Sequence, residues 1–111
     1  MSKATLTPTE LVTLAVLADR ARYGYAIVQE VTRRSGGTIN VRPGNLYRII
    51  DRLVERGLVA SAPTPDDDPA TDDRRQYYEA TDSGRQVAAD QLSMYADLLA
   101  ASDVLKNVVG S

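Results

Sequence analysis

Residues Pro43 to Leu58 read P-G-N-L-Y-R-I-I-D-R-L-V-E-R-G-L, and this stretch decides the fold. Apolar side chains recur in it at intervals of three and four, which predicts an amphipathic helix with one face on a core. The opposite face offers arginine, asparagine and tyrosine. Arginine can bind guanine or phosphate, asparagine can bind adenine, and tyrosine can reach the sugar-phosphate backbone. The pattern favours a helix that enters the DNA major groove, although a solvated amphipathic helix would share it. The inward residues are Leu46, Ile49, Ile50 and Leu53, and the outward ones are Asn45, Tyr47, Arg48, Asp51 and Arg52.

Composition limits the chemistry that the chain can perform. Its 111 residues suffice for one domain with one modest core. Cysteine and histidine are both absent, which excludes disulfides, the usual zinc sites and imidazole acid-base groups. No apolar run approaches the roughly 18 residues of a membrane span, and no secretory leader is evident. We therefore expect a soluble cytoplasmic protein without a cofactor, a metal or a membrane partner.

The charge is unevenly distributed along the chain. The formal net charge is −2, which at first argues against a nucleic-acid partner. Residues 20–56, however, hold eight arginines and three acidic residues, while the remainder holds five basic and twelve acidic residues. Because the local field decides what a surface attracts, the basic middle third permits DNA binding.

The flanking segments predict a helix-rich architecture with a small β-hairpin. Thr7 and Glu10 form a capping box around Pro8, and the Gly36-Gly37 pair ends a second helix. A loop with three prolines and five aspartates separates two strand-like segments. We expect a first helix from about residue 8 to between 19 and 22, further helices at about 24–35, 43–56 and 82–107, and strands at about 58–62 and 75–80.

The predicted last helix carries an unusually wide apolar band. A heptad seam runs along it, and further apolar residues lie beside that seam. A domain of this size cannot easily cover such a band, so we expect one part to pack on its own subunit and the rest on a second copy; a purely intramolecular core helix is the alternative. The seam is Val87, Gln91, Met94, Leu98, Ala101, Leu105 and Val108, flanked by Ala88, Leu92, Tyr95 and Leu99.

Three helices, a hairpin and a long helix are the plan of a winged helix-turn-helix domain with a dimerisation arm. Four stretches narrow the plan further, and the chain resembles the PadR family of bacterial transcriptional regulators, in its subgroup with a single terminal helix. The stretches that carry the resemblance are Y-G-Y-A-I from Tyr23, G-N-L-Y-R from Gly44, L-V-E-R-G-L-V from Leu53, and R-Q-Y-Y-E-A-T-D-S-G-R from Arg75.

The resemblance implies a homodimer that binds double-stranded DNA with an inverted repeat and represses an adjacent gene. It implies a winged helix-turn-helix domain over residues 1–81 and a dimerisation helix over 82–111. It also allows for release by a small aromatic inducer, in a cavity that the same residues could instead fill as a dimer core. The DNA contacts it implies are Tyr25, Asn45, Tyr47, Arg48, Arg74 and Arg75, with Arg42 and Arg52 added from position; the cavity residues are Met94, Tyr95, Leu98 and Leu99.

Two features depart from the family pattern. Ala80 replaces the usual leucine, which leaves a smaller side chain under the wing. The wing loop is acidic, and acid near phosphate is repulsive, so we expect a mobile loop with only Arg74 and Arg75 near DNA. A divalent-cation site is the alternative for this loop, which we consider a solvated acidic segment. Its carboxylates are Asp66, Asp67, Asp68, Asp72 and Asp73.

Two classes of function other than DNA binding are alternatives for this chain. A winged-helix module for protein–protein interaction, without sequence-specific DNA binding, is the alternative to a repressor. An enzyme is not expected, because the only carboxylate cluster lies in the Pro/Asp loop without a nucleophile and base beside it.

Overall fold

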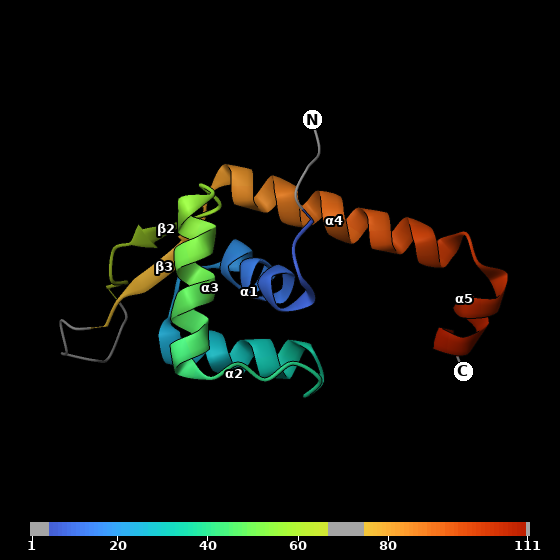
Figure 1. The fold of residues 1–111 in the computed structure, drawn as a ribbon, viewed down its shortest axis with the longest axis horizontal. Coiled ribbons are helices and arrows are strands. Elements are labelled where there is room, and N and C mark those ends of the chain that lie inside the picture. Colours follow the sequence, from blue (N-terminus) through green and yellow to red (C-terminus); the bar gives the residue numbers. More distant parts are fainter. Residues whose placement is uncertain (1–4, 67–74, 111) are drawn as a thin grey trace.

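The computed structural model describes residues 5–66 and 75–110 and confirms the predicted mainly helical fold with a small sheet. Within these residues the four core helices surround one apolar interior, and the sheet lies at one end (Figure 1). The elements are α1 Pro8–Asp19, β1 Arg22–Tyr23, α2 Gly24–Arg34, α3 Pro43–Glu55, β2 Val59–Ala62, β3 Tyr77–Ala80, α4 Asp82–Ala100 and α5 Asp103–Gly110.

Helix α1 is the central helix of the core. The Thr7 side chain accepts from the Glu10 amide, and the Glu10 carboxylate accepts from the Thr7 amide, which confirms the predicted capping box. Leu14 and Leu17 are completely buried, since α1 packs against both α2 and α4. The helix is apolar nearly all round because it has neighbours on most sides.

The α2 and α3 helices end where glycine permits a left-handed backbone. Gly36 and Gly37 follow α2 with φ of 61° and 82°, and Gly57 follows α3 with φ of 74°. The amides of Gly57 and Leu58 then bond to carbonyls in the last turn of α3, which satisfies groups that the helix end would leave unpaired. Both glycine ends agree with the predicted helix boundaries.

The sheet contains one strand more than the predicted hairpin. Strand β3 pairs antiparallel with β2 and, on its other edge, with β1, so the order is β1-β3-β2. Tyr77 is buried, whereas Tyr78 on the opposite face is half-buried, as expected for alternating side chains. Strand β1 is only two residues long, so it has no alternation from which sequence could identify it.

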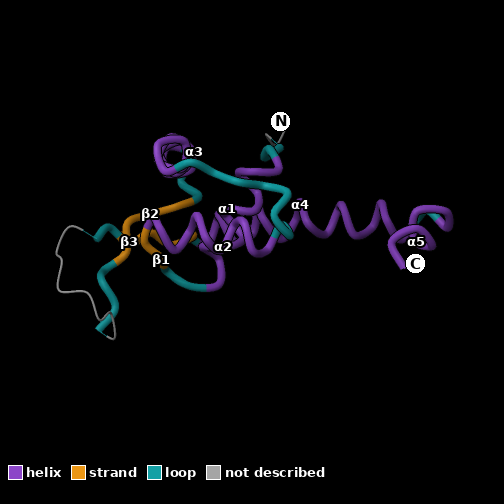
Figure 2. Tube along the Cα trace, turned by 90° about the horizontal axis from the view of Figure 1, so that it is seen from below, coloured by secondary structure: helices purple, strands orange, loops and turns teal. Residues whose placement is uncertain are grey.

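Helix α4 begins against the core and then leaves it. Gly84 sits on the Leu58 carbonyl, and Ala88 and Gln91 are buried. Beyond Gln91 the helix runs past the body of the protein toward the C-terminus (Figure 1), and the view from below shows the same projection (Figure 2). The structure therefore separates α4 into a packed first half and a projecting second half.

The prediction of one helix to about Asn107 is wrong, because the chain turns after Ala100 and starts α5 at Asp103. The Ser102 hydroxyl accepts from the Leu105 amide, so serine caps a new helix instead of continuing the old one. The first turn of α5 also contains Asp103, whose charge is favourable at a helix N-terminus. Among the described residues, no helix has the length and apolarity to cross a membrane.

The close packing at Gly84 predicts a large difference between two glycine-to-alanine substitutions. A Cβ at Gly84 would lie 2.1 Å from the Leu58 carbonyl oxygen, whereas a Cβ at Gly44, also helical, would meet nothing within 4 Å. Gly84→Ala should therefore lower the free energy of unfolding by about 1–3 kcal/mol. Gly44→Ala should raise it by up to about 1 kcal/mol. Urea denaturation of both variants measures this, and equal effects would contradict the packing.

Candidate nucleic-acid interface

The first two turns of α3 combine a fixed inner face with a polar outer face. Leu46, Ile49 and Ile50 are buried at 2% exposure or less, which holds the helix on the core. Arg42, Asn45 and Arg48 are all exposed on the other side. Pro43 occupies the first turn, and no acidic residue lies in that turn. The start of α3 therefore presents hydrogen-bond donors, backbone N–H groups and positive charge to the solvent.

Tyr47 joins the start of α3 to the start of α2. A Cβ added at Gly24 would lie only 2.5 Å from the Tyr47 hydroxyl oxygen, so the lack of a side chain at Gly24 allows this approach. Tyr25, the next residue, is 64% exposed, and its hydroxyl accepts a hydrogen bond of 3.1 Å from the Gln29 amide. The Tyr47 side chain thus lies against the first residue of α2, which is next to Tyr25 in the sequence.

The sheet approaches this surface through Tyr78. Burial raises the pKa of Tyr78 above its ordinary value, and Tyr47 and Asp51 nearby raise it further. The phenol of Tyr78 therefore lies within electrostatic range of α3. The wing and the outer face of α3 form neighbouring parts of one side of the protein.

Arg52 takes part in an ion pair with α1 as well as lying on the outer face of α3. Its Nε is 3.5 Å from Glu10 Oε2, and its side chain is 59% exposed while that of Glu10 is 11% exposed. A phosphate contact by Arg52 would have to share the guanidinium with this carboxylate. The sequence did not reveal the pair, because Glu10 already had a role in the capping box.

Arg75, at the start of the wing's returning strand, lies against aromatic rings. Its guanidinium carbon is 4.1 Å from the centre of the Tyr23 ring, a cation–π contact. The Tyr23 ring in turn lies 5.6 Å from Tyr77 at a tilt of 57°. Arg74, the other predicted wing contact, lies outside the described residues. So do Asp67, Asp68, Asp72 and Asp73, which leaves Asp66 as the described member of the acidic loop.

Much of the positive charge in the middle third is neutralised within the chain. Arg22, Arg33 and Arg34 all pair with Glu30, and Arg34 also lies 2.7 Å from Asp19. The hydrogen bond from Arg33 lowers the pKa of the Glu30 carboxyl, so Glu30 remains ionised. Within residues 5–66 and 75–110 no ion pair involves Arg42 or Arg48. The unneutralised arginines of this segment therefore include two at the start of α3.

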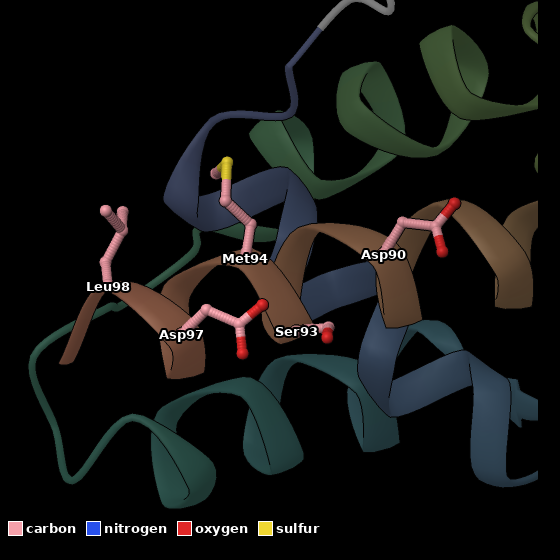
Figure 3. Close-up of a pocket in the computed structure, with 5 residues that line it drawn as sticks. All are labelled: Asp90, Ser93, Met94, Asp97 and Leu98. Carbon is pink, nitrogen blue, oxygen red and sulfur yellow. The ribbon is translucent and has the colours of Figure 1, made fainter. Parts of the chain in front are cut away.

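The second half of α4 exposes the predicted apolar band. Leu98 is 62% exposed, and Leu99 is half-buried. Met94 and Leu98 border an open hollow of about 390 Å³, whose five lining residues all come from α4 (Figure 3). A hollow lined by one helix has no opposite wall. The exposed large apolar side chains of α4 and α5 are Leu92, Met94, Tyr95, Leu98, Val104, Leu105, Val108 and Val109.

The structure adds residues that the sequence did not single out. Gln29 lies one helical turn after Tyr25, a spacing that could have suggested their hydrogen bond. Tyr23, whose ring faces the Arg75 guanidinium, belongs to β1, the strand that the sequence did not predict. Among the described residues, no group of three or more acidic side chains forms a metal site.

Comparison with known proteins assigns the chain to a family. The model of the transcriptional regulator PadR-like family matches residues 13–90. A protein of Lysinibacillus sphaericus, Uncharacterized protein X, is 24% identical over 85 residues, which cover 77% of this chain and 75% of that protein.

Solved structures of regulators share the fold. RosR of H. salinarum superposes with a TM-score of 0.69 at 30% identity, covering 95% of this chain and 87% of RosR. A PadR-like transcriptional regulator from Bacillus cereus gives the same TM-score at 17% identity, covering 92% of this chain and 91% of that one, which shows the fold alone. The chain belongs to the PadR-like family of transcriptional regulators, and its winged-helix DNA-binding fold marks it as a regulator and not an enzyme.

Proposed function

We propose that the chain is a dimeric repressor that inserts the start of α3 into the DNA major groove at each half of an inverted repeat. The observation that carries the proposal is the exposed surface of Arg42, Asn45 and Arg48 on a helix whose inner face is buried. Arginine and asparagine are the side chains that form bidentate hydrogen bonds with guanine and adenine. Asn45 and Arg48 would read bases, and Arg42 would contact phosphate.

The remaining contacts in the proposal surround this surface. Tyr25 and Tyr47 would reach the sugar-phosphate backbone, since their hydroxyls lie at the start of the two helices. Arg52 would contribute at the edge, in competition with Glu10. Arg75, and Arg74 beside it in the sequence, would contact the duplex from the wing.

Dimerisation is supported by the uncovered apolar side chains on α4 and α5. Contiguous apolar surface of this kind is rare on soluble monomers and is typical of interfaces. A second copy with the same band would cover it through a two-fold axis, and binding to an inverted repeat would require that dimer to hold its two recognition helices about 34 Å apart, one turn of DNA. Such a dimer would occupy operator DNA on one face and block transcription there.

The proposal also includes a small aromatic effector. Met94, Tyr95, Leu98 and Leu99 lie on the projecting half of α4, and methionine and tyrosine adapt well to flat aromatic molecules. The hollow beside Met94 also contains Asp97, whose carboxylate would favour a positively charged ligand. A second α4 would supply the missing wall.

Removal of the Arg48 guanidinium tests the DNA contact. Arg48→Ala should weaken binding to a duplex selected by the wild-type chain from a random pool by about 1–3 kcal/mol, because a bidentate base contact is lost. Arg33→Ala is the matched control, since Arg33 lies at the other end of α2 from Tyr25 and is paired with Glu30. Affinity measured by fluorescence anisotropy at several salt concentrations separates base contacts from the general electrostatic term. Equal losses in both variants would mean that only net charge matters, and selection of no duplex by the wild type would favour a protein partner.

A charge placed in the apolar band tests the dimer. Leu98→Asp should convert a dimer to a monomer, since an uncompensated carboxylate in an apolar interface is strongly unfavourable. Ala100→Asp introduces the same carboxylate at an exposed position of α4 that has no residue of the apolar band three or four positions before it, on the side opposite Leu98, and should leave the dimer intact. Light scattering of both variants and the wild type gives the molecular mass. A monomeric wild type at micromolar concentration would refute the interface.

A further inference from the structure

Gln91 carries a buried side-chain amide that joins α4 to the segment that precedes α1. It is 8% exposed, and its Oε1 accepts from the Leu6 amide while its Nε2 donates to the Leu6 carbonyl, both at 2.9 Å. Nε2 also donates to the Tyr95 hydroxyl at 2.9 Å. One side chain thus holds both backbone groups of Leu6, 85 residues away in sequence, and also reaches a tyrosine of the exposed band.

The segment held by Gln91 leads into α1, from which an ion pair reaches the recognition helix. Leu6 is 2% exposed and anchored in the core, and the next residue, Thr7, caps α1. The Thr7 amide donates to Glu10 Oε1 at 2.9 Å, while the other carboxylate oxygen of Glu10 lies 3.5 Å from Arg52 Nε. The buried side chains of Gln91 and Glu10 therefore both bond to a short backbone segment, Leu6 and Thr7, that lies between their contacts with α4 and α3.

We infer that Gln91 and Glu10 form a latch, through Leu6 and Thr7, that couples the position of α4 to that of the recognition helix α3. The observation behind this inference is the unbroken series of polar contacts from Tyr95 on α4 to Arg52 on α3. A ligand or partner that engages the Tyr95 hydroxyl would compete for the Gln91 amide and so loosen the segment that holds Glu10. Gln91 and Glu10 are positioning residues in this account, and its consequence for DNA rests on the proposed function.

The inner contacts of the latch differ from ordinary surface hydrogen bonds because Gln91 and Glu10 are both buried. A buried polar group that loses its partner is costly, so the amide and its partners move together. Gln86, one turn earlier on α4, provides the comparison: its Nε2 donates to Asp90, and it is exposed. Replacement by leucine should therefore affect distant parts of the chain at Gln91 but not at Gln86.

Hydrogen–deuterium exchange of the full chain without DNA tests the coupling. Gln91→Leu should speed amide exchange in residues 43–56 about fivefold, as expected for loss of a buried hydrogen bond that restrains local opening. Residues 24–35 of α2, which lie outside the latch, should change less than twofold. Gln86→Leu should leave both segments unchanged. Glu10→Gln, which keeps an acceptor for Thr7 but removes the charge that faces Arg52, should also speed exchange in residues 43–56.

The double variant decides between coupling and separate structural roles. If the latch is one unit, Gln91→Leu combined with Glu10→Gln should speed exchange in α3 no more than Glu10→Gln alone. An additive effect would overturn the inference, as would an effect of Gln91→Leu that stops at residues 5–12 and α4, or one that is equal in all segments. Should Gln91→Leu not fold, Tyr95→Phe removes only the exposed hydroxyl; it should still speed exchange in residues 43–56, and no change there would overturn the inference.

A DNA titration separates this inference from the proposed function. The probe is the duplex selected from a random pool by the wild-type chain, and Tyr95→Phe should change its affinity at least twofold while Gln86→Leu does not. If the wild type selects no duplex, the proposed function fails while the exchange result still decides on the latch. If DNA binds but Tyr95→Phe alters neither exchange nor affinity, the latch fails while the proposed function stands.

Discussion

The contact between the start of α4 and the end of α3 is the constraint on which the remaining structure depends. The Leu58 carbonyl accepts from the Thr81 amide at 3.0 Å, and Gly84 lies directly against the same carbonyl. The Thr81 hydroxyl both donates to the Gly57 carbonyl at 2.6 Å and accepts from the Gly84 amide. The residue that begins α4 is therefore bonded to the turn that ends α3. These contacts fix the first turn of α4 against the C-terminal end of the helix proposed to read DNA.

This junction explains why the protein can combine a rigid body with an uncovered arm. The packed half of α4 is fixed at Gly84 and again at Gln91, about two turns later. Beyond Gln91 most of the large apolar side chains of α4 are exposed, and the second copy of the proposed dimer would cover them. In that dimer, α4 would both carry the interface and set the orientation of the body, so the two DNA-binding surfaces would have a defined spacing.

The electrostatics are local, which reconciles an acidic chain with a nucleic-acid partner. Glu30 forms ion pairs with three arginines and Glu10 forms one with a fourth, so these arginines stabilise the fold as well as adding charge. Arg42 and Arg48 lie at the start of α3, where the helix dipole adds to their positive field. The net charge of −2 is therefore a poor guide to the field at this surface.

The sequence predicted the elements whose signals are local. The capping box at Thr7, the glycines after α2 and α3, and the apolar stripe of α3 each specify a neighbouring backbone conformation. It did not predict β1, which exists only because β3 pairs with it, nor the Gln91 and Glu10 contacts, which join residues far apart in the chain. The turn before α5 is different: Ser102 and Asp103 carried a capping signal, but the heptad seam running through them favoured a continuous helix.

The candidate site could likewise be predicted where its signals are local and not where it depends on contacts between distant residues. Exposure of Asn45, Tyr47 and Arg48 could be predicted because the buried residues of α3 fix its orientation. The contact of Tyr47 with the first residue of α2 could not, since it depends on the space above Gly24.

The projecting arm also has a consequence for abundance. In the proposed dimer, a protomer would complete its apolar packing only with a second molecule, so folding would be of second order and the melting temperature would rise with concentration. Scarce copies would then expose the arm to proteases, whereas dimers would protect it. The cellular dose of the regulator would then set its lifetime together with its occupancy of DNA.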